Sequence, residues 1–188
     1  CLYSSYKCSR CSFPPTNTHA LRSCATKSII RGFTGPGHTM RTAIISDIHG
    51  NLEALISVLA DIDQRDVGRI VCLGDILGYG PNPTECVDLV ADRCEWSLLG
   101  NHDYGALYEP TNFNAAAEKA AYWTRAQFDG EEDKEVAARR WEFLGGLRVR
   151  TLMDDFLCVH GTPRRPINEY LFPDDAINSP VKMKQIFD

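Results

Sequence analysis

The sequence of 188 residues contains no apolar run of about 18 residues, the length that a membrane-spanning helix needs. We therefore expect no segment that spans a membrane. Hydrophobic residues still make up 44% of the chain, which is enough to bury one sizeable core. The composition predicts a single domain preceded by a tail.

Acidic residues are absent from residues 1–40, which carry five of the 20 lysines and arginines. The rest of the chain holds all 25 acids and is therefore strongly acidic. An acidic body disfavours the binding of bulk nucleic acid, because that binding depends on neutralising many phosphates. The binding of a single phosphate group at metal ions is still compatible with this charge.

The cysteines show no pattern of a disulfide framework in the body of the chain. Cys72 and Cys158 lie inside apolar runs, where a thiol behaves as a small buried hydrophobic group. This usage is typical of a reducing compartment, so we expect a cytoplasmic protein.

Residues 1–39 lack the periodicity of a helix or a strand and end with Gly-Pro-Gly shortly before Met40. We expect a disordered or non-native extension over residues 1–39, with Met40 opening the first strand. Two alternatives remain open, namely an organellar transit peptide and a small zinc site. The residues with zinc-binding side chains are Cys8, Cys11, His19 and Cys24.

Four short apolar runs each end in residue types that bind metal ions. They are TAIIS before Asp47-Ile48-His49-Gly50-Asn51, RIVCL before Gly74-Asp75, WSLL before Gly100-Asn101-His102-Asp103, and FLCV before His160-Gly161. Each run predicts a buried strand, and the carboxyl ends of parallel strands meet at one edge of a sheet. We therefore expect these side chains to converge. Oxygen and imidazole donors suit Mn, Fe, Co, Ni or Zn.

The segments between these runs have the periodicity of helices, so the chain predicts an α/β fold with a parallel sheet. Asn51 is a candidate cap for the first helix. Further on, two strands around Asp154-Asp155 predict a hairpin that opens a second sheet. The expected helices cover residues 52–62, 84–93, 114–128, 131–144 and a segment starting at Pro180, and the expected hairpin strands are Arg148–Leu152 and Phe156–His160. The aromatic residues of the 114–144 helices are expected in the core.

The motifs DIHGN, GDILGYG, GNHD and VHG resemble, in this order, the motif series of the calcineurin-like metallophosphoesterases. More narrowly, the sequence is similar to the small bacterial and archaeal phosphodiesterase branch, and the resemblance runs from about Met40 to the last residue. The resemblance implies a two-sheet αββα sandwich whose second sheet is incomplete here. It also implies a dinuclear metal-dependent phosphoesterase that hydrolyses a small phosphate ester, with phosphodiesters as the expected substrates.

The resemblance further implies which residues bind the two divalent ions. Asp47 and His49 would bind the first ion, Asn101 and His160 the second, and Asp75 would bridge them. Mn²⁺ is the ion expected first, with Fe, Ni, Zn or Co as alternatives.

Three further residues are candidates for catalysis or substrate binding. His102 would face the leaving oxygen as a protonated imidazole, and Asp103 would orient or charge it. Arg164, which is followed by Arg165, is expected to grip a substrate phosphate.

The sequence departs from the family pattern in two respects. Gly78, Tyr79 and Gly105 replace an Asp and two arginines of the protein Ser/Thr phosphatase branch, which disfavours that activity. No His follows His160, so the closing Gly-His-x-His motif is missing, and we interpret residues 40–188 as a truncated metallophosphoesterase domain. Two alternatives stay open: a non-catalytic binding module of the same fold, and a hydrolase of dinucleoside polyphosphates or cyclic nucleotides. No oligomeric state is predicted.

Overall fold

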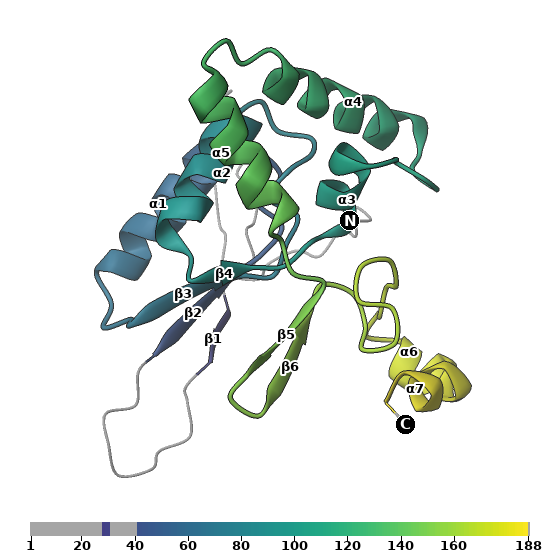
Figure 1. Ribbon diagram of the computed structural model, residues 1–188. Helices are drawn as coiled ribbons and strands as arrows, with labels where there is room; N and C mark the ends of the chain where they lie inside the picture. The colour runs from purple at the N-terminus through teal and green to yellow at the C-terminus, as the bar shows by residue number, and fades with distance from the viewer. Residues whose placement is uncertain (1–27, 31–40, 188) are drawn as a thin grey trace, which may run out of the picture.

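The computed structural model describes residues 28–30 and 41–187, which form an α/β fold built on one four-stranded sheet (Figure 1). Its strands are β1 (Ser28–Ile30), β2 (Thr42–Ile45), β3 (Arg69–Cys72) and β4 (Trp96–Ser97), in the order β1-β2-β3-β4. Strands β2, β3 and β4 are parallel, and β1 is antiparallel to β2. The expected parallel sheet is therefore confirmed.

Two helices connect the parallel strands and complete the expected β-α-β-α-β series. Helix α1 (Leu52–Asp63) follows β2, and the side chain of Asn51 caps it by accepting a 3.0 Å hydrogen bond from the backbone N–H of Ala54. Helix α2 (Pro83–Arg93) follows β3 and has Pro in its first turn, where no N–H is needed. Both crossovers return the chain to the same end of the sheet, so the strand ends that carry ligand residues face one edge.

Side chains alternate along the strands and give the sheet two different faces. Ala43 and Ile45 of β2 belong to a core with α1, α2 and α5 (Lys134–Gly145). Ile44 and Val71 point to the opposite face, where they pack with Met153. The hairpin that carries Met153 therefore covers part of the second face of the sheet.

The hairpin consists of β5 (Arg150–Met153) and β6 (Phe156–Val159), which pair antiparallel as a two-stranded sheet. Asp154 and Asp155 form its turn, as expected, and Asp154 adopts a positive φ of 54°. Helices α6 (Asp175–Asn178) and α7 (Pro180–Phe187) follow at the carboxyl-terminal side. Within the residues described, no helix has the length and apolar character needed to cross a membrane.

Some elements differ from the sequence-based expectations. Ser28–Ile30 forms a strand against β2, although no strand was expected before Met40. Helix α3 (Asn101–Leu107) was not expected, because its first residues were assigned to a metal-binding loop. In α4 (Ala115–Asp129), Tyr122 and Trp123 are largely exposed, whereas Phe128 is buried against Trp141 as expected. Met40 and the four residues of the alternative zinc site lie outside the described residues.

Candidate metal centre

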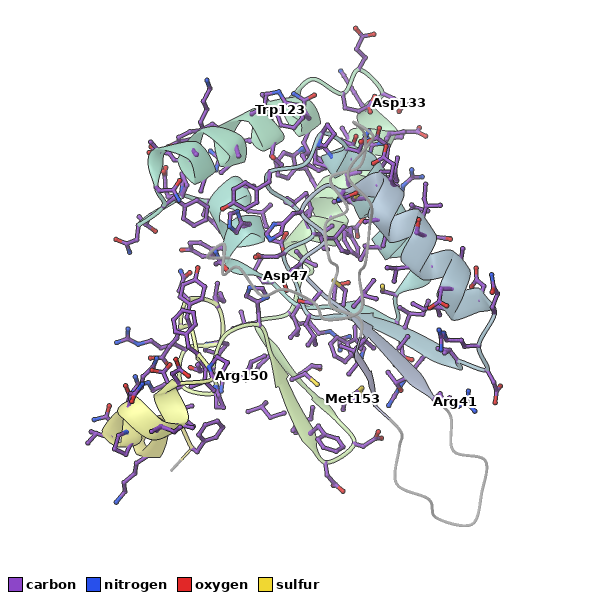
Figure 2. All side chains as sticks on the ribbon, turned by 180° about the vertical axis from the view of Figure 1, so that it is seen from behind. Arg41, Asp47, Trp123, Asp133, Arg150 and Met153 are labelled. Atoms are coloured by element: carbon purple, nitrogen blue, oxygen red, sulfur yellow. The ribbon has the colours of Figure 1, made fainter. Side chains whose placement is uncertain are left out.

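The residues that follow β2 and β3 adopt unusual backbone conformations that bring the two segments together. Asp47, His49 and Asp75 have φ values of 56°, 51° and 54°, in the left-handed region that side chains rarely favour. The backbone N–H of Asp47 donates to the carbonyl of Gly74 at 3.1 Å, and that of His49 donates to the carbonyl of Asp75 at 2.9 Å. Figure 2 shows Asp47 near the centre of the view, at the end of β2 opposite Arg41, and its side chain is 35% exposed. These bonds hold strained residues in place at the sheet edge.

The carboxylate of Asp75 lies directly against the turn that starts α3. The backbone N–H of His102 donates to its Oδ1 at 2.8 Å. A Cβ atom at Gly100 would lie 2.1 Å from the same oxygen and 2.3 Å from the backbone nitrogen of Asp75. Only glycine fits at this position, because any side chain would overlap Asp75.

The second oxygen of Asp75 lies between two imidazoles. Its Oδ2 is 3.7 Å from His49 Nε2 and 3.5 Å from His160 Nε2. His49 Nε2 is also 3.8 Å from Asp47 Oδ1, and His160 Nε2 is 3.1 Å from Asn101 Oδ1. The structure thus brings together all five predicted ligand residues, with Asp75 in the middle.

The ring orientations of the two histidines fit metal binding. The Nδ1 atom of His49 lies 3.0 Å from the carbonyl of Leu77, and that of His160 lies 2.8 Å from the carbonyl of Leu73. Such carbonyls accept a hydrogen bond from Nδ1–H, which favours the tautomer whose Nε2 is free to bind a metal ion. The Nε2 atom of His49 is buried and has no hydrogen-bond partner within the described structure. A buried nitrogen without a partner is costly, and a divalent ion would satisfy it.

The electrostatics of the cluster couple Asp75 to the imidazoles. Burial raises the pKa of Asp75, but the interaction with His160 and the charges of His49 and His102 outweigh it, so the pKa is lowered. Burial lowers the pKa of His160, but Asp75 and the carbonyl of Leu73 outweigh it and raise the pKa to about 9. In the free protein a proton therefore occupies His160 at neutral pH, where a cation would bind.

His102 lies beside these ligands but in a more apolar setting. Its ring packs between Tyr79 and Phe113, with centroid distances of 4.6 and 4.8 Å, and lies 4.8 Å from the ring of His49. Burial lowers the pKa of His102 to about 4, so the imidazole is neutral at pH 7 rather than protonated as expected. Metal-binding atoms of His49, Asp75 and His102 lie within 4.8 Å of one another. His102 is therefore close enough to act either at the ions or on a substrate.

Asp103 is fully buried and binds the backbone of the site. Its Oδ2 accepts hydrogen bonds from the N–H groups of Asp75 and Gly100 at 2.8 and 3.0 Å, and its Oδ1 accepts one from Leu77 at 2.9 Å. Burial and the charge of Asp75 raise its pKa to about 7, although these N–H groups oppose the shift. These bonds fix the position of Asp75, and the predicted action of Asp103 on the imidazole of His102 remains a prediction.

Arg164 forms a different interaction from the one expected. Its Nε lies 2.9 Å from Oε2 and 3.1 Å from Oε1 of Glu169, and its Nη1 donates to Oε1 of Gln185 at 2.8 Å. Arg164 and the hydroxyl of Thr162 lower the pKa of Glu169 to about 2. The guanidinium of Arg164 is thus bound to neighbouring side chains, and its contact with a substrate phosphate remains a prediction.

Two aromatic residues lie beside His102, and the sequence gives a signal for only one of them. Phe113 precedes α4 and packs on the imidazole, and Tyr79 lies in the glycine-rich loop after β3. Tyr79 lies between two glycines, and glycines allow the backbone to approach other groups closely, so the sequence indicates a close contact at this position. No comparable signal exists around Phe113.

The fold and the side-chain cluster together define a class of α/β protein with a candidate metal site. Its parallel strands end at carboxylate, amide and imidazole groups, and these groups fit divalent transition metals. A family model described as calcineurin-like phosphoesterase matches residues 40–185. The chain belongs to the calcineurin-like phosphoesterase family, and the resemblance stated from the sequence motifs is confirmed.

Two relatives are similar over most of this chain. An uncharacterised protein of Methanocaldococcus jannaschii is 42% identical over 135 residues, which cover 70% of this chain and 54% of that protein. The crystal structure of a metallophosphoesterase from Sphaerobacter thermophilus is 39% identical with a TM-score of 0.60, and the match covers 79% of this chain and 57% of that one. The chain thus spans little more than half the length of either relative.

Proposed function

We propose that this chain carries the metal centre of a dinuclear phosphoesterase that hydrolyses small phosphodiesters. The observation that carries the proposal is the position of Asp75 Oδ2, 3.7 Å from His49 Nε2 and 3.5 Å from His160 Nε2. A carboxylate between two imidazoles suits a ligand shared by two ions. When bound, a pair of divalent ions would polarise the phosphoryl oxygens and lower the pKa of water, so that hydroxide would be available to attack phosphorus.

The roles of the remaining residues follow from their contacts. Asp47 and His49 would hold one ion and Asn101 and His160 the other, with Mn²⁺ as the proposed metal. The carbonyls of Leu77 and Leu73 would keep both imidazoles in the tautomer that binds metal.

We propose that His102 donates a hydrogen bond to the leaving oxygen. A neutral imidazole still carries one N–H donor, so this role does not require the protonated form. Replacement His102→Ala should then retain the metal and lose roughly 10²–10³-fold in turnover, the usual effect of one such donor. Loss of metal along with activity would instead identify His102 as a ligand.

We also propose that the hairpin β5–β6 belongs to the second layer of an αββα sandwich. The contacts of Met153 with Ile44, Val71 and Leu98 support this arrangement. The exposed side chains of Leu152 and Leu157, at 73% and 44%, are consistent with a layer that has room for further strands.

The direct test is hydrolysis of bis-p-nitrophenyl phosphate with added Mn²⁺. The wild type and the control Asp63→Asn, which changes an exposed carboxylate of α1 paired with Arg93, should be equally active. His160→Ala should lose most of the activity. Hydrolysis that is independent of Mn²⁺, or unaffected by the loss of His160, would contradict the proposal.

A further inference from the structure

Tyr79 has a strained backbone that places an aromatic ring at the metal centre. Its φ of 51° lies in the left-handed region, which bulky residues with a Cβ seldom adopt. Strain of this kind persists where surrounding contacts impose it, and it is concentrated at functional sites. The conformation of Tyr79 therefore needs an explanation in terms of its neighbours.

The loop around Tyr79 is pressed against the histidines of the site. The backbone N–H of Gly80 donates to the carbonyl of His49 at 2.8 Å. A Cβ atom at Gly80 would lie 2.3 Å from that carbonyl oxygen, and one at Gly78 would lie 2.8 Å from Nδ1 of His102. Both neighbours of Tyr79 must therefore be glycine, which lets the backbone on either side of Tyr79 lie against His49 and His102.

The ring of Tyr79 is partly covered and partly free. Its centroid lies 5.1 Å from that of His49, in an edge-on arrangement, and 4.6 Å from that of His102. The residue is nevertheless 50% exposed, whereas Leu77 in the same loop is 1% exposed. A residue that served only to fill space beside His102 would be buried like Leu77. The exposed part of the ring is an apolar, aromatic surface next to the groups that would bind phosphate.

We propose that Tyr79 forms a binding subsite that stacks on a planar aromatic ring carried by the phosphate ester, as in a nucleotide. This inference rests on the proposed phosphoesterase function and narrows its substrates to esters with such a ring. Base stacking on aromatic side chains is favourable and depends little on the identity of the base. The subsite would therefore bind nucleotide-like phosphate esters more tightly than alkyl phosphates, without specificity for one particular base.

The test compares the binding of adenosine 5′-monophosphate with that of inorganic phosphate, by calorimetry on the Mn²⁺-loaded protein. Tyr79→Asn is the informative variant, because asparagine tolerates the left-handed backbone that Tyr79 adopts. It should weaken nucleotide binding about tenfold, within the range for one stacked base, and leave phosphate binding unchanged. Tyr79→Phe should bind both ligands as the wild type does. Tyr122→Leu, which removes an exposed ring from α4, is the matched control and should change neither affinity.

Each contrary result has a distinct meaning. Equal affinities of the wild type for the nucleotide and for phosphate would overturn the stacking subsite and leave the phosphoesterase proposal intact. Equal losses of both affinities in Tyr79→Asn would also overturn it, because Tyr79 would then only position His49 and His102. A wild type that binds Mn²⁺ but no phosphate would overturn the proposed function, and the subsite with it.

Discussion

The Nε2 atom of His160 lies 3.1 Å from Oδ1 of Asn101, although 59 residues separate them in the sequence. His160 is held near Asn101 through the backbone of Arg148, which pairs with the end of β4. Its N–H donates to the carbonyl of Ser97 at 3.0 Å, and its carbonyl accepts from the N–H of Leu99 at 2.8 Å. This pairing anchors the start of the hairpin beside β4, so β6 delivers His160 to the beginning of α3. The proposed second metal position therefore depends on the attachment of the hairpin to the sheet.

Gly100→Ala should unfold the site, because its Cβ would overlap the carboxylate and backbone of Asp75. We expect a loss of about 1–3 kcal/mol in the free energy of unfolding, typical of overpacking, together with weaker Mn²⁺ binding. Urea denaturation measures the first effect. Gly145→Ala is the control, since a Cβ there has nothing within 4 Å and should leave stability unchanged or slightly higher. Similar stabilities for the two variants would show that the Asp75 loop can move aside.

Asp103→Asn should destabilise the protein by roughly 1–3 kcal/mol, because an amide N–H₂ would face a buried backbone donor that has no other partner. Thermal or urea unfolding measures the loss. Asp133→Asn is the matched control: Asp133 caps α5 with the same type of bond, and asparagine is an equally good cap at an exposed helix start. If both substitutions had equally small effects, the three bonds to Asp103 would not hold the site together.

The sequence predicted the parts of the fold that depend on local chemistry. The side chain of Asn51 caps α1 as expected, because a side-chain oxygen can accept from the first backbone N–H groups of a helix. Three of the four strand-end motifs converge because β2, β3 and β4 are parallel strands joined by right-handed crossovers, which share one edge. Asp47, His49, Asp75 and Asn101 could therefore be placed together without knowledge of any contact. His160 follows β6 of the antiparallel hairpin, so this reason does not account for its position.

The features that the sequence did not predict depend on contacts between distant segments. The positive φ values of Asp47 and His49 are imposed by hydrogen bonds to the loop after β3, and no local signal specifies them. Arg164 could equally have bound a phosphate, but Glu169 and Gln185 lie within reach in the folded chain. Helix α3 is short and begins at Asn101, so its pattern could not be separated from that of a loop.

Metal binding should release about one proton from His160 near pH 7.5. The pKa of His160 is raised to about 9 in the free protein, so the imidazole is protonated there, whereas a ligand imidazole must be neutral. Metal affinity should therefore increase as the pH rises toward 9. Calorimetry with Mn²⁺ in two buffers of different ionisation enthalpy counts the protons released.

The matched variant for this measurement is His160→Ala, which should bind the metal more weakly and release about one proton fewer. An unchanged proton count in His160→Ala would mean that the proton comes from another group. The charge state assigned to His160 would then be wrong.

The proposed bridging role of Asp75 is tested most directly by counting Mn²⁺ ions per chain in the wild type, Asp75→Asn and Asp63→Asn, by calorimetry and electron paramagnetic resonance. The wild type and Asp63→Asn should bind two ions with magnetic coupling between them. Asp75→Asn should lose at least one ion and the coupling, because Oδ2 of Asp75 lies within 3.7 Å of His49 Nε2 and 3.5 Å of His160 Nε2. Two ions bound by Asp75→Asn with unchanged affinity and coupling would contradict a shared carboxylate at this centre.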